Sequence, residues 1–549
     1  MKRLIEEAIR ESLRHLAADQ PGLDPEMLAF GVTPPNRSEH GDFSSNVALV
    51  AGAALGIRDR RGLAEFLATD LSFPAGAIER IEVAGAGFLN FFVDDRWYQR
   101  LVADIVAADE AYGRQAAGAR QRVLVEFVSA NPTGPLTVGH GRNAVLGDVL
   151  ARLYEWAGWA VTREYYFNDA GRQMRMLGES VRARYRELLG EQAELPEGGY
   201  EGGYIVDIAR AVRDEHGDEQ AEAPVELFQK AAEAAIFADI DQTLRRLGIR
   251  FDAYYNENSL YTNGAIDEVV AGLRARGLVY DKDGAVWLSG QPLGLDKDPV
   301  LIKSSGEPTY RLPDMAYHRD KIRRGFDRIV DVFGADHIDT CQEVLAAVKA
   351  LGERTDHIKV VLYQFVTLSR GGVQVKMSTR KANFETLDAL LDEVGADAVR
   401  YFFAMRSPHS HMDFDLDLAK RQANDNPMFY VQYGHARICS ILRRDEAAPL
   451  ADEPLDLAVL TDAAERALVT QLARLPDTLA RALDEHEPHR LTTYAAEVAT
   501  AFHGFYDRCP VLSAETRKLA RARLELVHAA RIVLRNVLHM LGVDAPERM

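Results

Sequence analysis

The hydrophobic period changes twice after residue 122, which predicts a strand, a helix and a second strand. Residues 123–128 (VLVEFV) form a nearly continuous apolar run, typical of a buried strand. Residues 143–156 place apolar side chains three or four positions apart, as on one face of a helix, and residues 161–167 again indicate a strand. A unit of this length predicts two parallel strands joined by a right-handed crossover.

Further along, the pattern continues as an α/β layer. Residues 170 to about 265 are charged and mostly helical in pattern, and we interpret them as an insertion. Residues 279–289 predict a hairpin that turns at Asp283 and Gly284. Residues 328–333 predict another buried strand of the parallel type. It ends in 334-GADH-337, at the edge where open α/β sheets collect ligands.

The two ends of the chain differ from this middle part. Residues 1–103 predict a small α/β domain, and residues 104–121 a connector. From about residue 410 onward the pattern is helical throughout. The predicted fold class is a multidomain α/β protein. A doubly wound, parallel-sheet, Rossmann-like domain at 122–405 carries the helical insertion, and an all-α bundle follows at 410–549.

The last helical segment has one apolar and one basic face. The basic face holds a single acid, Glu525, among Arg517, Lys518, Arg521, Arg523, Arg531 and Arg535. Two interpretations are open: a solvated surface, or a surface that contacts a phosphate backbone.

Composition mainly excludes classes of protein. The 549 residues carry a formal net charge of -18, which argues against non-specific nucleic-acid binding over the whole surface. Three widely spaced cysteines argue against a disulfide scaffold and against a cysteine-rich zinc site. The sequence has no apolar run of about 18 residues, and its amphipathic first helix carries several acids, unlike a signal peptide. We therefore expect a cytoplasmic protein that does not span a membrane.

The segment between the first strand and its helix, 129-SANPTGPLTVGHGRNAVLGD-148, carries candidate chemistry. Doubly wound sheets bind nucleotides where a strand turns into a helix. The G-x-G-x-x-G and G-x-x-x-x-G-K-[ST] signatures are absent, which disfavours a simple dehydrogenase or a P-loop ATPase. Gly139 would let a flat ring approach the backbone, and His140 would place a donor where phosphate is favoured. Such a turn suits ATP held for attack on its α-phosphorus, although alone it also fits a turn with a surface histidine.

A second segment, 376-KMSTRKAN-383, supplies cations for the same chemistry. Lys376, Arg380 and Lys381 lie in a loop that follows Gly371 and Gly372. A basic loop can fold over a polyphosphate and neutralise charge as pyrophosphate leaves. Neither segment is specific alone, but together they favour the activation of a substrate by ATP.

The chain resembles the class I aminoacyl-tRNA synthetases and, among them, the arginyl-tRNA synthetases. The 129–148 segment is similar to the family's HIGH region and 376-KMST-379 to its KMSK loop. The resemblance extends to 39-EHGDFSSNVAL-49, to 413-DFDLDLAKRQANDNPMFYVQYGHARICSILR-443 of the helical anticodon-binding domain, and to 545-APERM-549. It covers nearly the whole chain in order.

This resemblance implies a two-step reaction. The arginine carboxylate would attack the α-phosphate of ATP, giving arginyl-adenylate and pyrophosphate, and the 3′ end of tRNA(Arg) would then accept the arginine. Catalysis would rest on positioning and charge stabilisation. The resemblance also implies Mg²⁺ carried on the ATP phosphates and no protein-bound metal. We expect a monomer whose partners are tRNA(Arg), L-arginine and ATP.

The same resemblance implies the site residues. A guanidinium is a planar fork of donors that pairs best with carboxylates. The implied arginine-binding residues are Glu126, Ser129, Asn131, Tyr310, Asp314 and His337. The implied ATP-binding residues are Thr137, Gly139, His140, Gly334, Asp336, Lys376, Met377 and Ser378, and the catalytic candidates are His140, Lys376, Thr137 and Arg380. The tRNA-binding candidates are Tyr430, Tyr433, Arg437 and Met549.

Three of these positions also have plain structural explanations. Glu126 could be half of a buried ion pair, because a lone buried carboxylate is costly. Asp314 follows a proline and could cap the next helix. Tyr310 could belong to a hydrophobic core.

Two positions depart from the family pattern. Thr137 stands at the first histidine of the HIGH region, and Thr379 at the second lysine of the KMSK loop, which leaves Lys376 or Arg380 to stabilise pyrophosphate. We predict that Thr137→His keeps or raises activity. Two alternatives stay open: a synthetase for another amino acid, disfavoured by Glu126 with Asp314, and an inactive tRNA-binding relative, disfavoured by the intact His140.

Overall fold

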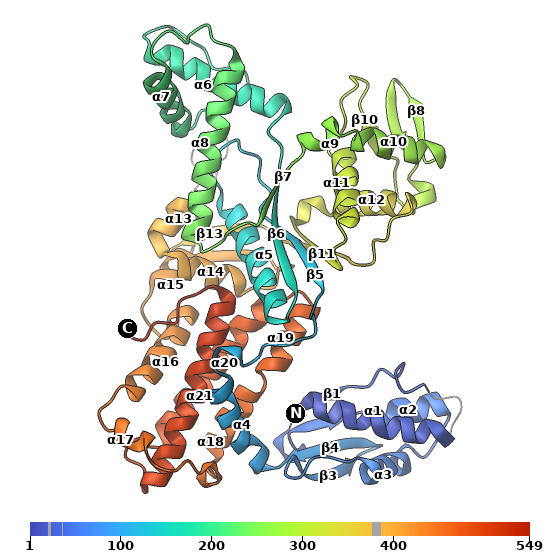
Figure 1. Ribbon diagram of the computed structural model, residues 1–549, viewed down its shortest axis with the longest axis vertical. Coiled ribbons are helices and arrows are strands. Elements are labelled where there is room, and N and C mark those ends of the chain that lie inside the picture. The colour runs from blue at the N-terminus through green and yellow to red at the C-terminus, as the bar shows by residue number, and fades with distance from the viewer. Residues whose placement is uncertain (20–23, 36, 376–385) are drawn as a thin grey trace.

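A five-stranded parallel sheet forms the centre of the molecule (Figure 1). The computed structural model describes residues 1–19, 24–35, 37–375 and 386–549. The sheet order is β12-β11-β5-β6-β7, and every neighbouring pair is parallel. Its strands are β5 (Arg122–Glu126), β6 (Ala160–Phe167), β7 (Ala253–Asn256), β11 (Arg328–Gly334) and β12 (Ile358–Tyr363). The chain runs from β5 to one side and returns as β11 on the other, which creates a topological switch point.

Helix α5 (Val138–Trp156) joins β5 to β6 and is buried along most of its length. It packs against β5, β6 and β11. Gly147 permits this close approach, since a Cβ atom there would lie 2.2 Å from the Phe127 ring. The predicted strand–helix–strand unit is therefore confirmed. The helix begins five residues earlier than the predicted 143, because the polar and glycine-rich first turn carries no apolar period.

The insertion after β6 consists of α6 (Gly171–Leu188), α7 (Gly203–His216) and α8 (Val225–Arg246), which pack on one another. They project from the sheet at the top of Figure 1. Residues 253–256, inside the predicted insertion, instead form β7 and pair with β6. A four-residue strand between charged helices is too short to show a period of two.

A hairpin and two sheet-covering helices follow β7. The predicted turn at Asp283 and Gly284 is confirmed: both residues have positive φ, 52° and 75°, as a two-residue hairpin requires. The elements here are α9 (Asn258–Thr262), α10 (Ala265–Ala275), β8 (Val279–Lys282), β9 (Ala285–Leu288), η3 (Gln291–Leu293), β10 (Val300–Ile302), α11 (Arg311–Arg323), η4 (Ala335–His337) and α12 (Ile338–Ala350).

A smaller sheet lies beyond β12, in the order β14-β13-β15. Its strands and the neighbouring helices are β13 (Val366–Arg370), β14 (Val373–Val375), α13 (Leu387–Val394), α14 (Ala396–Ala404), β15 (Met412–Asp415) and α15 (Leu416–Lys420). The expectation that the chain is helical throughout from 410 is wrong in this detail, because β15 pairs in parallel with β13. Only that distant pairing defines residues 412–415 as a strand.

The N-terminal part has a four-stranded antiparallel sheet in the order β1-β2-β4-β3. Its elements are α1 (Lys2–Asp19), β1 (Val32–Thr33), η1 (Ser38–His40), β2 (Phe43–Ser45), α2 (Val47–Leu55), α3 (Arg60–Asp70), β3 (Ile78–Ala84) and β4 (Phe88–Val93). Helix α4 (Asp95–Ala108) then packs against the C-terminal helices α18 and α21, followed by η2 (Asp109–Ala111). Residues 104–108 of the predicted connector thus belong to α4.

The C-terminal part is a helical bundle. Its elements are α16 (Pro427–Leu442), α17 (Ala448–Ala451), η5 (Leu457–Val459), α18 (Ala463–Ala473), α19 (Leu475–Asp484), α20 (His489–Arg508) and α21 (Arg517–Leu541). Most of the basic residues of α21 form ion pairs: Arg517 with Glu453, Lys518 with Asp456, Arg521 with Glu525, Arg523 with Glu465 and Arg535 with Asp109. These acids disfavour the phosphate-contact interpretation of this face. In the described ranges, no helix is both long and apolar enough to cross a membrane.

Candidate active site

The turn that leaves β5 has an unusual backbone. β5 ends at Glu126, and Val128 and Ser129 then adopt positive φ angles of 65° and 44°. This conformation is costly for a β-branched residue such as valine. Tyr165 donates from its hydroxyl to the Ala130 carbonyl at 2.8 Å, and Asn143 binds the Val128 N–H at 2.6 Å. Side chains from β6 and α5 thus hold the turn from both sides.

The first turn of α5 fixes the orientation of His140. Thr137 is the N-cap of the helix and accepts from the His140 N–H, while His140 Nδ1 accepts from the Thr137 N–H at 3.1 Å. Because Nδ1 accepts, the neutral imidazole carries its proton on Nε2. Burial lowers the pKa of His140, which keeps the ring neutral at pH 7. His140 is therefore a neutral, pre-oriented donor at a helix N-terminus.

The segment that follows the predicted basic loop reaches this same helix start. Lys376, Met377, Ser378 and Arg380 lie outside the described residues. The described chain before them ends β14 at Val375. After them, Thr386 forms a bridge with Thr137, and Leu387 donates its N–H to the Leu136 carbonyl at 2.8 Å. Two segments that are about 250 residues apart in sequence therefore meet beside His140.

Glu126 takes part in a buried cluster of charges. Its carboxylate accepts from the Lys321 ammonium and, at 2.8 Å, from the Ser129 hydroxyl. Lys321 also donates to Asp331 at 2.7 Å, and His318 lies 3.1 Å from the other Asp331 oxygen. Burial raises the pKa of Glu126, and Lys321 offsets this only in part because it serves two carboxylates. Glu126 is thus half of a buried ion pair, as its structural explanation predicted. It also lies next to the strained turn.

Asp314 has no ion-pair partner among the described residues. It lies inside α11, and among the described residues its carboxylate has no hydrogen-bonding partner, so it does not cap the helix. Withdrawal from water raises its pKa to about 7; His318 opposes that shift, and Glu126 and Glu257 add to it. Tyr310, at the N-cap of α11, is 71% exposed and belongs to no core. Asp314 thus lies in a region of buried carboxylates, where the charges of His318 and Lys321 offset the effect of burial only in part.

Glu257 is a site residue that the sequence analysis missed. It is 5% exposed and accepts from the Tyr166 hydroxyl and from the Asn168 amide, both at 2.7 Å. Burial raises its pKa, and its charge acts on Asp314. Its position could have indicated a role: Glu257 directly follows the short strand β7, at the carboxyl edge of the sheet where ligands bind. Because β7 was not predicted, that signal was not visible.

Comparisons with known proteins agree along the whole chain. Residues 3–93 match the arginyl-tRNA synthetase N-terminal domain, 101–405 the class I tRNA synthetase (R) catalytic domain, and 431–549 the DALR anticodon binding domain. The arginine–tRNA ligase of Salinibacter ruber is 49% identical, over 98% of this chain and 99% of that protein. The chain belongs to the arginyl-tRNA synthetase family. It is an arginine–tRNA ligase, a class I enzyme that uses ATP to join arginine to tRNA.

Solved structures share this architecture. A Thermus thermophilus arginyl-tRNA synthetase superposes with a TM-score of 0.78 over 100% of both chains at 23% identity. A Campylobacter jejuni structure described as an arginyl-tRNA synthetase gives 0.77 at 28% identity, over 83% of this chain and 100% of the other. The two alternatives left by the sequence, another amino acid specificity and an inactive relative, are therefore not needed for this arginyl-tRNA synthetase.

The remaining predicted residues of this synthetase line the same sheet edge. Asn131 accepts from the Asn168 N–H at 3.0 Å and donates to Gln173 at 3.3 Å. Gly334 ends β11, and Asp336 and His337 follow it in η4 with exposed side chains. These groups lie at the carboxyl ends of the strands that flank the switch point, where ligands bind.

The tRNA-binding candidates of the synthetase gather on α16. Tyr430, Tyr433 and Arg437 belong to this helix; the Tyr433 ring stacks on Phe429 at 5.9 Å between centroids. The C-terminal tail runs along the same helix, because Arg443 donates to the Glu547 carbonyl at 2.7 Å. Met549 ends this tail and is 56% exposed.

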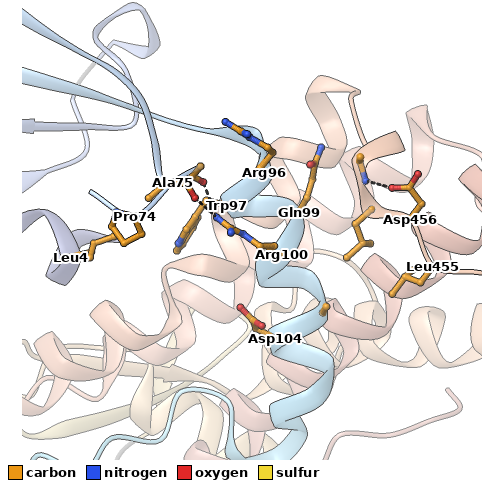
Figure 2. A pocket seen from close by; sticks show the side chains of 15 residues that line it. Leu4, Pro74, Ala75, Arg96, Trp97, Gln99, Arg100, Asp104, Leu455 and Asp456 are labelled. Atoms are coloured by element: carbon orange, nitrogen blue, oxygen red, sulfur yellow. Dashed lines mark hydrogen bonds between the residues drawn. The ribbon is translucent and has the colours of Figure 1, made fainter. Parts of the chain in front are cut away.

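A separate cavity of about 890 Å³ is lined by none of these residues (Figure 2). It lies between the N-terminal part, α4 and residues 455–458. Arg96 and Arg100 line it, but Arg96 pairs with Asp94, and Arg100 donates to the Gly76 carbonyl at 2.9 Å. Asp104 and Asp456 line it too, so its lining does not favour an anion.

Proposed function

We propose that arginine and ATP bind on either side of residues 126–140, at the carboxyl edge of the central sheet. The observation that carries this proposal is Asp314, whose carboxylate has no ion-pair partner in the described part of the chain and feels the charges of Glu257 and Glu126. A substrate guanidinium would supply positive charge to both Asp314 and Glu257, and its planar fork of donors would give the Asp314 carboxylate hydrogen bonds. An amino acid without that fork would leave Asp314 unpaired, which penalises it strongly.

The reaction geometry assigns the two ends of the substrate. The arginine carboxylate has to reach the α-phosphate beside His140, so the α-amino end belongs near the turn at Ser129 and Asn131. The guanidinium then points toward Asp314 and Glu257, with Tyr310 and His337 at the solvent side of the pocket. Glu126 acts through the Ser129 hydroxyl that it orients.

ATP is proposed to lie along the start of α5. Gly139 leaves room for the ring, His140 donates from Nε2 to a phosphate, and Thr137, Gly334 and Asp336 border the site. Lys376, with Met377, Ser378 and Arg380, would come from the loop that precedes Thr386, the bridge partner of Thr137. Mg²⁺ would arrive bound to the ATP phosphates, since it prefers phosphate oxygens and water as ligands. Catalysis is then positioning plus charge stabilisation, and the side chains form no covalent intermediate.

The tRNA(Arg) would span the molecule. We propose that residues 122–405 catalyse the reaction, that 410–549 read the anticodon through Tyr430, Tyr433, Arg437 and Met549, and that 1–103 contact the body of the tRNA. Stacked aromatic rings next to a cation on α16 suit unpaired bases. The proposal places a monomer in the cytoplasm, where its free cysteines Cys341, Cys439 and Cys509 remain reduced.

Arginine affinity should depend on pH through Asp314. Its pKa is raised to about 7, so below pH 7 the free enzyme holds a proton that the guanidinium must displace. The Kd for arginine should therefore rise roughly tenfold per pH unit below pH 7 and level off above about pH 8. Calorimetric titrations with arginine from pH 5.5 to 8.5 measure this. A Kd that stays constant over that range would contradict the role of Asp314.

The overall proposal is tested by ATP–pyrophosphate exchange with each of the twenty amino acids, with and without tRNA. We expect exchange with arginine alone. The tRNA-free reactions show whether the tRNA must be bound before adenylate forms. Exchange with another amino acid at a similar rate would contradict the assignment of Asp314 and Glu257 to a guanidinium.

A further inference from the structure

Asn143 joins three parts of the active site through one side chain. It is 4% exposed and lies on α5, three residues after His140. Its Oδ1 accepts from the Val128 N–H at 2.6 Å, and its Nδ2 donates to the Val332 carbonyl at 2.8 Å. Only one orientation of the amide satisfies both bonds, because one partner is a donor and the other an acceptor. The helix that carries His140 is thereby tied to the β5 turn and to β11.

The turn held by Asn143 is the one that would relax without it. Val128 and Ser129 are consecutive residues with positive φ, and valine populates that region only when its surroundings impose it. The turn separates Glu126 from Asn131, so its conformation sets where both side chains stand. If Val128 returned to an extended backbone, Ser129 would lose its 2.8 Å bond to Glu126 and its 3.2 Å bond from the Tyr166 N–H.

We propose that Asn143 is a positioning residue that locks the left-handed turn at Val128 and Ser129 and so aligns the arginine-binding groups with His140. The inference rests on the proposed function, since it presumes that this turn binds the amino end of arginine. Asn143 contacts neither substrate. It acts by fixing the distance between the groups on the β5 turn and the nucleotide-binding start of α5.

A small shift is enough for a large kinetic effect, because misplacement by about 1 Å can cost roughly 10²-fold in rate. Asn143→Ala should raise the KM for arginine roughly tenfold or more and lower kcat, while the KM for ATP changes much less. The buried Asn536 on α21, which donates to the Asp109 carbonyl at 2.9 Å, provides a matched control. Asn536→Ala should lower the Tm without changing the KM for arginine.

Rescue separates positioning from a general loss of stability. Glycine adopts positive φ without a steric cost. Adding Val128→Gly to the Asn143→Ala variant should therefore raise its activity at least threefold, although Tm stays low. Val128→Asn is the second rescue variant, because asparagine tolerates the left-handed region and keeps a side chain there. All variants are compared by arginine-dependent ATP–pyrophosphate exchange with tRNA present, together with Tm.

The outcomes are distinct. A KM for arginine within twofold of wild type in Asn143→Ala would overturn the inference, as would failure of both Val128 variants to restore activity. A wild-type enzyme without arginine-dependent exchange would instead refute the proposed function. Raised KM for arginine, a normal KM in Asn536→Ala and recovery by either Val128 variant would support the positioning role.

Discussion

Replacing His140 by alanine should lower the kcat of arginine activation by roughly 10²-fold or more, in the range seen for a lost transition-state donor. The backbone of α5 holds His140 Nδ1 through the Thr137 N–H, which leaves Nε2–H free to donate. Charge develops on the phosphate oxygens as the α-phosphorus is attacked, and a pre-oriented donor stabilises that charge without reorganising. The rate of ATP–pyrophosphate exchange at saturating ATP and arginine, with tRNA present, measures the effect.

The His140→Gln variant serves as the control for helix stability. A glutamine three residues after a threonine N-cap can reach back to the N-cap N–H, so it preserves the capping box. We expect the Tm of His140→Gln to match that of the wild type. Its kcat should stay below the wild-type value, because the glutamine amide does not replace the imidazole Nε2–H as a donor to the phosphate. A near-normal kcat for His140→Ala would remove His140 from the catalytic assignment.

Replacing Asp314 by asparagine should lower kcat/KM for arginine by on the order of 10²- to 10³-fold, the range for removing one partner of a desolvated charge pair. The substitution keeps the shape of the side chain and removes only the charge that the guanidinium meets. The matched control is Asp320→Asn on the same helix, whose carboxylate pairs with Arg324 at 3.0 Å. That variant should retain arginine activation within a few-fold.

Asp314→Asn should also stabilise the free enzyme at high pH. The pKa of Asp314 in the folded protein, about 7, lies above its ordinary value, so the folded state holds a proton that the unfolded chain has lost. Stability from this group is therefore present at low pH and decreases as pH rises through 7. At pH 8 the variant should have a higher Tm than wild type, and arginine should raise the Tm of wild type only. An unchanged kcat/KM for arginine would contradict the assignment of Asp314 to the guanidinium.

The departure at Thr137 now has a structural meaning. Threonine is a better N-cap than most residues, and here it orders the helix turn that orients His140. Thr137→His would exchange that cap for a cation, which weakens the expectation that activity rises. The sequence alone could not show this, because the helix start lies five residues before the first apolar period.

Local pattern determined much of this protein. The apolar runs at 123–128 and 328–333 predicted parallel strands, and the Asp283-Gly284 pair predicted its hairpin, since burial on both faces and positive φ each leave a signature in neighbouring residues. The family motifs indicated the partners of the reaction, ATP, arginine and tRNA, because HIGH-like and KMSK-like segments are short and continuous. The sequence did not predict β7 and β15, since strands of four residues are defined by the distant strands with which they pair.

What only the tertiary structure decided is the charge and strain at the site. Glu126 pairs with Lys321, which lies 195 positions away, whereas Asp314 has no ion-pair partner among the described residues and Glu257 joins it from the far edge of the sheet. The sequence likewise does not indicate the left-handed backbone at Val128 or the hydrogen bond that Asn143 makes with it. The physical reason is common to these cases: pKa shifts and backbone strain depend on which groups folding brings within a few ångströms, and sequence spacing does not record that distance.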